Sequence, residues 1–200
     1  MIKSEVTVCA AISRSASVKQ TKDGQSFVSF GVTIPITGRD GSTANLDISV
    51  TMDGDMVTAA RFTTGRRVQV LGILTVRKKG DNTYFNLKAE GGVELAKSTE
   101  PDSIEGTLEF MGKVGKKGVE NHVDGKNRPF QTFSAWSSDH DGENIEFIWV
   151  RFLNFQPQGE DFMSANGYIT AKGDLQISVY KSTIGIDCRV KELSAWKKKR

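Results

Sequence analysis

The chain has 200 residues, of which 38% are hydrophobic and 26% charged, and its formal net charge is +3. These values exclude wholesale disorder and are ordinary for a globular chain of one large domain or two small ones. The net charge is too small to establish a polyanionic partner, so local clusters of charge must decide that question.

The first residues, MIKSEVTVCAAIS, lack the long apolar core and the cleavage site of a signal peptide. No apolar run approaches the roughly 18 residues that span a bilayer. The two cysteines, Cys9 and Cys188, lie in apolar runs far apart in the chain, which favours core packing over a disulfide bond. We therefore expect a cytoplasmic protein with no membrane segment.

Short alternating runs separated by Gly, Asp and Asn predict strands throughout the first half. These runs are VTVCAAI, FVSFGVTI, NLDISVTM, RVQVLGILTVR and TYFNLKA. Between the third and fourth runs, DMVTAARFTTG (55–65) has apolar residues near helical spacing and ends in a glycine. The spacing predicts a helix over 55–65.

Basic residues of the first half lie in turns and at strand ends, where they would contact a phosphate backbone. They are Arg39, Arg66, Arg67, Arg77, Lys78 and Lys79. The last three belong to the hairpin RKKGDNTYFN, in which Tyr84 or Phe85 would stack beside them. The alternative for each residue is a solvated charged surface. The outward strand positions nearby hold no aromatic side chain, only Thr33, Asp47, Ser49 and Thr51.

The polar segment KSTEPDS (97–103) predicts a linker, placed at 99–103 between domains 1–98 and 104–200. The second half then repeats the plan with GTLEFMG, FQTFSAW, IEFIWVRF, YITAKGDLQISVY and IGIDCRVKEL, and with a helix-sized gap at GEDFMSANG (159–167). DGQSFVSFGV aligns with DGKNRPFQTFSA, NLDISV (45–50) with NIEFIWV (144–150), and VLGILTV (70–76) with AKGDLQI (171–177). This near-constant offset indicates an internal duplication.

Three strands, a short helix and two strands follow each other in the order of the OB-fold. The sequence therefore predicts an all-β tandem OB-fold: two five-stranded Greek-key barrels, each with one short helix. In that fold the outer face of the second and third strands, with the neighbouring loops, binds the ligand.

The segment GTLEFMGKVGKKG (106–118) does not fit a phosphate-binding P-loop, because its glycine spacing is wrong and no helix signal follows. A basic loop at the edge of the second barrel is the better interpretation of Lys113, Lys116 and Lys117. Two more basic candidates, Lys126 and Arg128, lie in the next turn. His122 and His140, the only histidines, lack metal-ligating spacing, and no nucleophile motif occurs. We expect no metal, no cofactor and no catalytic residue.

The aromatic residues of the second half carry a clearer signal. Alternation from an inward Phe133 places Trp136 on the outer face of its strand. In IEFIWVRF the inward set is Ile148, Val150 and Phe152, which leaves Phe147, Trp149 and Arg151 outside. Aromatics with an arginine on an exposed strand form a stacking platform for bases. The alternative is that this face is buried against the other barrel or a second subunit.

The first half resembles the bacterial single-stranded DNA-binding protein (SSB) family over residues 5–95. DGQSFVSFGVTI is similar to that family's Asn-Gly…Phe-Ser-x-Ala strand, and ARFTTGRRVQVLGIL to its helix followed by Gly-x-x-Val-x-Val-x-Gly-x-Leu. The second half is similar more loosely, over 104–195, where IEFIWVRF resembles the strand with a DNA-stacking Trp and an Arg. On that match Phe147 takes the stacking position and Trp149 the next outward one.

The resemblance implies a non-enzymatic OB-fold protein that coats unwound DNA during replication, repair or recombination. Members with two barrels per chain pair as homodimers. This chain ends WKKKR where the family has an acidic tip that recruits other enzymes, so recruitment through such a tip is in doubt. We predict binding of single-stranded DNA with little sequence preference; RNA suits the same surface. The rivals are a protein-interaction or assembly module, and a nuclease, for which Asp53 and Asp55 alone do not supply a carboxylate cluster.

Overall fold

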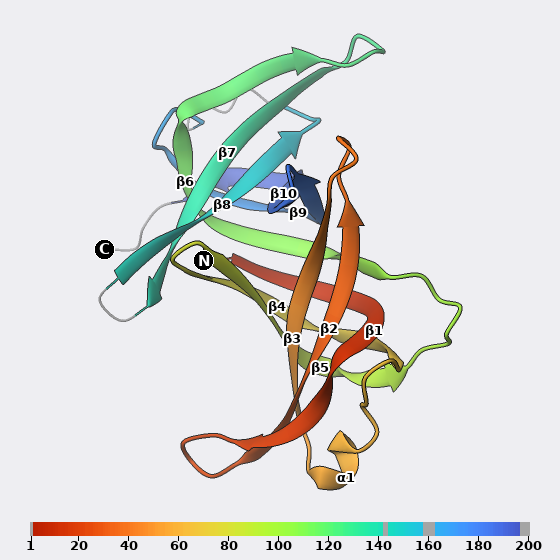
Figure 1. The fold of residues 1–200 in the computed structure, drawn as a ribbon. Coiled ribbons are helices and arrows are strands. Elements are labelled where there is room, and N and C mark those ends of the chain that lie inside the picture. Colours follow the sequence, from red (N-terminus) through yellow and green to blue (C-terminus); the bar gives the residue numbers. More distant parts are fainter. Residues whose placement is uncertain (1, 142–143, 158–162, 197–200) are drawn as a thin grey trace.

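The computed structural model describes residues 2–141, 144–157 and 163–196 (Figure 1). The elements in chain order are β1 (Ile2–Gln20), β2 (Ser26–Thr37), β3 (Thr43–Asp53), α1 (Met56–Ala59), β4 (Arg67–Lys79), β5 (Asn82–Leu95), β6 (Ser103–Val123), β7 (Pro129–Asp141), β8 (Asn144–Asn154), β9 (Tyr168–Tyr180) and β10 (Thr183–Ala195).

The ten strands form one continuous sheet that closes into two five-stranded units with the same connectivity. In the first, the order is β2-β3-β5-β4-β1, and β1 also pairs with β2. In the second, the order is β6-β7-β8-β10-β9, and β9 also pairs with β6. The third and fifth strands of each unit run parallel, and the other pairs are antiparallel. This is the five-stranded Greek-key barrel of the OB-fold, present twice, as the sequence predicted.

Matching glycines show that the two barrels share one plan in detail. A Cβ on Gly72 would lie 2.1 Å from the carbonyl oxygen of Lys88, and one on Gly173 would lie 2.1 Å from that of Arg189. Both glycines therefore allow the fourth strand to approach the fifth closely. The predicted alignment of 70–76 with 171–177 is confirmed, because it pairs these two glycines.

One part of the predicted alignment is wrong. The alignment of DGQSFVSFGV with DGKNRPFQTFSA pairs Phe30 with Phe133, and both residues are buried. Phe30 pairs with Val50 on the next strand, whereas Phe133 pairs with Phe152. Phe152, not Val150, is therefore the counterpart of Val50. Each strand alternates apolar and other residues, so a shift of two residues leaves the pattern almost unchanged.

The two barrels are joined edge to edge through β1 and β6. These strands pair antiparallel from Ile2 with Phe110 to Cys9 with Ser103. The same part of β1 pairs with β4 on its other side. At Gly106 a Cβ would lie 2.0 Å from the carbonyl oxygen of Glu5, so this junction requires a glycine.

The predicted helix over 55–65 is much shorter than expected, since α1 covers only 56–59. Its first turn is capped by Asp55, whose carboxylate accepts the backbone N–H of Thr58 at 2.9 Å. Beyond it, Phe62 leaves helical geometry and stacks on Phe30 in the core, with ring centroids 5.2 Å apart. The packing of the Phe62 ring in the core outweighs the helix propensity of residues 55–65. No helix in the described part of the chain is long and apolar enough to cross a membrane.

The second predicted helix, over 159–167, lies partly outside the described residues, which resume at Met163. The described remainder, 163–167, forms a turn. Both cysteines are free and buried in the structure, which confirms the predicted core packing. Burial, followed by the nearby carboxylates of Asp174 and Asp187, raises the pKa of the Cys188 thiol to about 12.

Candidate nucleic-acid interface

The predicted faces of β7 and β8 are confirmed by burial. Val150 is 1% exposed, whereas Trp149, the residue before it, is 51% exposed. Phe147 lies on the same outer face and is 43% exposed. Trp136 of β7 lies directly opposite Trp149 in the antiparallel register. The period of two places these aromatic rings outside the barrel.

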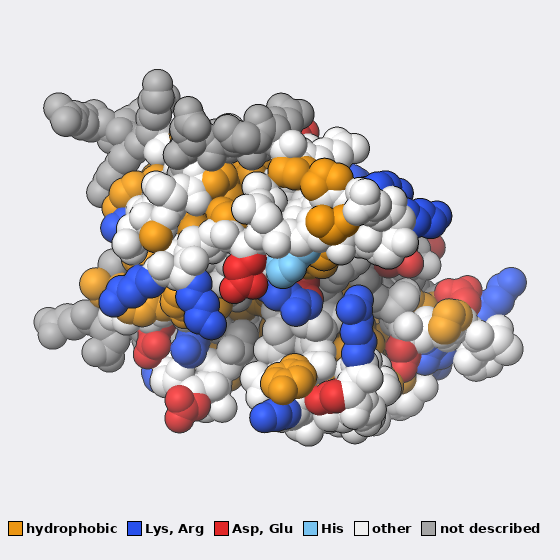
Figure 2. Space-filling model, turned by 90° about the horizontal axis from the view of Figure 1, so that it is seen from above, with side chains coloured by type: hydrophobic (Ala, Val, Ile, Leu, Met, Phe, Trp, Pro, Cys, Tyr) orange, Lys and Arg blue, Asp and Glu red, His pale blue; other side chains and the backbone are white. Residues whose placement is uncertain are grey.

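A groove of about 580 Å³ lies on this outer face. Its lining includes two indole rings, three basic side chains and one carboxylate: Trp136, Trp149, Lys116, Lys117, Arg151 and Glu120. One wall is the bulge of β6 between 114 and 119, where a Cβ on Gly115 would lie 3.0 Å from the Trp149 ring. Seen from the side of β6 and β7, hydrophobic side chains and Lys or Arg side chains lie close together (Figure 2). The groove therefore combines ring faces with positive charge.

Two contacts hold the aromatic side of the groove in place. The ring of Phe147 meets that of Trp136 edge to face at 4.7 Å between centroids. The ammonium group of Lys113 lies 5.8 Å from the Trp136 ring centroid, within reach of a cation–π interaction. Trp136 is thus a supporting ring between its neighbours, and Trp149 is the more open one.

Arg151 is partly committed to the protein itself. Its Nη2 donates to the carboxylate of Asp187 on β10 at 2.6 Å. The Asp187 side chain is 7% exposed, whereas that of Arg151 is 56% exposed. Arg151 therefore neutralises a buried carboxylate with one edge and presents the rest of its guanidinium to the groove.

The matching outer face of the first barrel is polar. Thr33 Oγ1 donates to the Asp47 carboxylate at 2.6 Å, where the second barrel has aromatic rings. A groove of about 480 Å³ on this face is lined by Tyr84, which is 48% exposed. Phe85 is 4% exposed and belongs to the core, so the prediction that it could stack on a base is wrong. Tyr84 is the exposed ring of this hairpin.

The basic hairpin between β4 and β5 touches the β7–β8 hairpin of the second barrel. Arg77 forms an ion pair with Asp139, and the backbone N–H of Gly80 donates to Glu146 at 3.1 Å. These contacts bring the hairpin to the strand that carries Phe147. Of the other basic side chains of this hairpin, Lys78 is half-buried and Lys79 is exposed.

Arg39 occupies the β2–β3 turn and lines a cleft of about 860 Å³ between the barrels. This cleft meets the groove at Glu120, Thr132 and Arg151, which line both. Its charged lining is mostly acidic, with two arginines against five carboxylates: Asp40, Asp102, Glu105, Glu120 and Asp187. Arg39 is therefore set apart from the basic surface of the groove.

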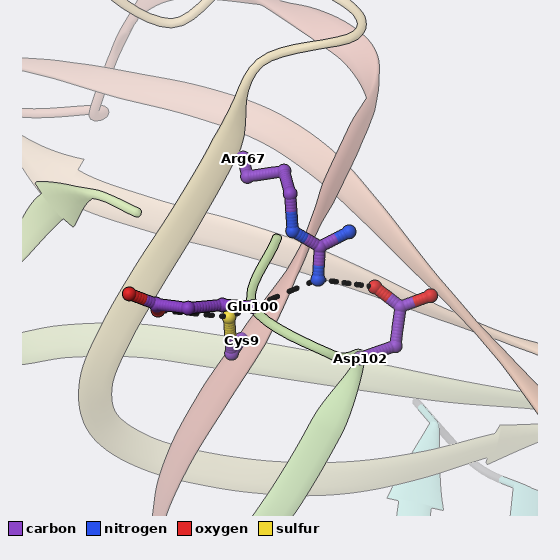
Figure 3. Close-up of polar contacts among 4 residues, drawn as sticks. All are labelled: Cys9, Arg67, Glu100 and Asp102. Atoms are coloured by element: carbon purple, nitrogen blue, oxygen red, sulfur yellow. Dashed lines mark hydrogen bonds and ion pairs between the residues drawn. The ribbon is translucent and has the colours of Figure 1, made fainter. Parts of the chain in front are cut away.

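Arg66 and Arg67, at the start of β4, do not line the groove. Arg66 Nη1 donates to the carbonyl oxygen of Arg61 at 3.2 Å. Arg67 Nη2 donates to Asp102 at 2.7 Å and lies 3.9 Å from the sulfur of Cys9 (Figure 3). Arg67 thus ties the segment that precedes β6 to the first barrel.

Lys126 and Arg128 lie in the β6–β7 turn, outside the groove lining. The Asp124 carboxylate accepts the backbone N–H groups of Lys126 at 2.8 Å and Arg128 at 2.9 Å, and pairs with the Arg128 guanidinium at 2.7 Å. The Arg128 backbone hydrogen bond is the main cause of a lowered pKa for Asp124. Arg128 fixes the turn through Asp124, and the side chains of Arg128 and Lys126 are both exposed.

The structure adds an aromatic ladder that the sequence did not predict. The Phe130 ring stacks on His122 at 5.0 Å and on Phe155 at 5.4 Å, and the Arg189 guanidinium lies 5.0 Å from the Phe155 centroid. Counting in twos from Trp149 places Phe155 on the outer face, so alternation would have found it. His122 and Arg189 come from other strands and carry no local signal.

The fold and the groove define an all-β protein with two OB-folds in one chain and an aromatic, basic groove on the second. No protein-family model matches the chain, and no curated protein matches it in sequence.

Similar folds are known among solved structures. The wild-type single-stranded DNA-binding protein of Thermus aquaticus has a TM-score of 0.51 and 11% identity, over 98% of this chain and 94% of that one. A deletion mutant of the same protein has a TM-score of 0.50 and 13% identity, over 98% and 96%. At this identity the likeness shows a shared fold over nearly the whole chain.

Proposed function

We propose that this protein binds single-stranded DNA with little sequence preference, without catalysis, on the outer face of its second barrel. The observation that carries the proposal is the 580 Å³ groove, in which Trp136 and Trp149 lie beside Lys116, Lys117 and Arg151. One protein that shares the fold over nearly the whole chain, solved as wild type and as a deletion mutant, is named for binding single-stranded DNA, which supports this choice of ligand.

The chemistry of the groove suits a single strand better than a duplex. Bases in a single strand are unpaired and offer their faces to aromatic rings, and each stacked base contributes about 1–3 kcal/mol. Lysines and arginines neutralise phosphates whatever the base sequence. Stacking depends little on base identity, because every base has a π-face. The half-exposed Trp149 ring is the proposed stacking residue.

The proposed biological role is to coat unwound DNA in the cytoplasm during replication, repair or recombination, with homodimers that bring four barrels together. These parts follow from the sequence resemblance. The homodimer is tested by sedimentation equilibrium, in which a mass twice that of the chain supports it and the mass of one chain excludes it.

A titration of tryptophan fluorescence with oligo-dT, beside a duplex of equal length, tests the binding proposal. We expect quenching by the single strand and little change with the duplex. An oligo-U strand of the same length compares RNA with DNA on the same surface. Equal binding of strand and duplex would contradict the proposal.

The two rival functions, an interaction module and a nuclease, predict different results when dilution and magnesium are added to this titration. If the aromatic face is a subunit or partner interface, oligo-dT leaves the fluorescence unchanged while dilution of the protein changes it. If the protein is a nuclease, labelled strands become shorter when magnesium is added. The proposed function predicts that the labelled strands stay intact with and without magnesium.

A further inference from the structure

A row of residues runs across the strands at one end of the second barrel. Lys113 on β6 pairs with Trp136 on β7 to one side and with Tyr168 on β9 to the other. Trp136 in turn pairs with Trp149 on β8. The backbone N–H of Trp196 donates to the carbonyl oxygen of Tyr168 at 2.9 Å, which places Trp196 next to Tyr168 after the end of β10. We call these five residues the belt.

Side-chain contacts join Trp136, Lys113, Tyr168 and Trp196, and Trp149 adjoins Trp136 through the strand register. The Lys113 ammonium lies 4.6 Å from the Tyr168 ring centroid and 5.8 Å from that of Trp136. Tyr168 and Trp196 meet edge to face at 5.3 Å between centroids. Tyr168 is 43% exposed. With strands about 4.8 Å apart, four steps carry this surface roughly 19 Å from Trp149 to Trp196.

The first barrel shows that the fold does not require these aromatics. Its register places Ala11 between Thr33 and Arg67, and Thr33 opposite Asp47. The backbone N–H of Ala96 donates to the carbonyl oxygen of Arg67 at 3.0 Å, as that of Trp196 does to Tyr168. The same five positions thus hold no aromatic ring in the first barrel. The aromatic belt is a property of the second barrel alone.

We propose that a single strand held in the groove continues across the barrel along the belt, passing Lys113 and stacking on Tyr168 and Trp196. This inference rests on the proposed function. The ligand is a single-stranded nucleic acid, because the exposed Tyr168 ring and the half-buried Trp196 ring lie beside the Lys113 cation, and such strands require both stacking and phosphate contact. Continuity with the groove through Trp136 and Trp149 makes this a second section of one path.

Single-tryptophan variants test the belt, since the chain has only three tryptophans. Trp136→Phe with Trp149→Phe leaves Trp196 as the reporter, and Trp136→Phe with Trp196→Phe leaves Trp149. Oligo-dT of about 20 nucleotides exceeds the site of one OB-fold. We expect both reporters to be quenched over the same range of strand concentration. Quenching of Trp149 alone would overturn the belt and leave the proposed function standing.

An affinity measurement gives a second test. Tyr168→Ala should weaken binding of the 20-nucleotide strand about tenfold, by loss of one stacked base. Tyr180→Ala is the matched control, because Tyr180 is a 65% exposed tyrosine at the other end of β9. Wild-type affinity for Tyr168→Ala, measured on folded protein, would also overturn the belt. Absence of any strand binding by the unaltered protein would overturn the proposed function together with the belt.

Discussion

The variant Trp149→Ala tests whether the Trp149 side chain binds a single strand or only stabilises the fold. Trp149 is 51% exposed, so its truncation to alanine removes about half of the contacts that a core tryptophan makes. Core Trp→Ala changes cost about 3–5 kcal/mol, and we therefore expect Trp149→Ala to lower the free energy of unfolding by ~2 kcal/mol. Loss of one stacked base should weaken oligo-dT binding by about 1–3 kcal/mol, roughly five- to 150-fold in Kd.

The neighbouring residue supplies the control. Val150 is 1% exposed, and Val150→Ala should cost about 2 kcal/mol through two lost methyl groups and the cavity that they leave. The two variants are thus matched in stability and differ only in the face that they alter. Chemical denaturation measures the free energy of unfolding of each variant. Fluorescence anisotropy of a labelled strand measures its Kd for oligo-dT. Equal oligo-dT affinity for the two variants would refute the stacking role of Trp149.

The remaining predictions concern charge, division of the chain and pH. Affinity for oligo-dT should fall with salt at a log–log slope of about −3 to −4, for roughly four to six neutralised phosphates, and a slope near zero would exclude phosphate-dominated binding. Residues 1–98 and 103–200, expressed separately, should each fold, although each fragment exposes the edge that joins β1 to β6; random-coil circular dichroism from both would contradict the proposed two-domain division. Arg151→Ala should lower stability by about 1–3 kcal/mol, because the Asp187 carboxylate stays buried without its ion-pair partner, and adding Asp187→Asn should restore part of the loss. The pKa of the Cys188 thiol is raised to about 12 in the folded protein, whereas the unfolded thiol ionises near pH 8.5. The free energy of unfolding should therefore fall by about 1 kcal/mol between pH 8 and 9.5, because only the unfolded state loses this proton in that range. The variant Cys188→Ala should remove this pH dependence.

Strand faces were predictable because side chains alternate with a fixed period of two. Once Phe133 is taken as inward, the outward position of Trp136 follows, and the same counting separates Trp149 from Val150. The duplication was predictable for a similar reason, since glycines and aromatic residues recur at a nearly constant offset. Both signals can be found along the sequence without knowing which strands pair.

Pairings between distant segments were not predictable. The ladder that joins β1 to β6 and the ion pair of Arg77 with Asp139 depend on how two barrels meet, and neither leaves a pattern in its own stretch of chain. The belt belongs to this class, because Lys113 and Tyr168 become neighbours only through strand register. The helix over 55–65 was overestimated because Phe62 packs into the core instead of extending the helix.

Ultraviolet cross-linking of oligo-dT, followed by mass spectrometry of the cross-linked peptides, shows directly which barrel face binds the strand. We expect cross-links in the peptides of β7 and β8, above all at Trp149. Cross-links confined to the first barrel, for example at Tyr84, would contradict this expectation.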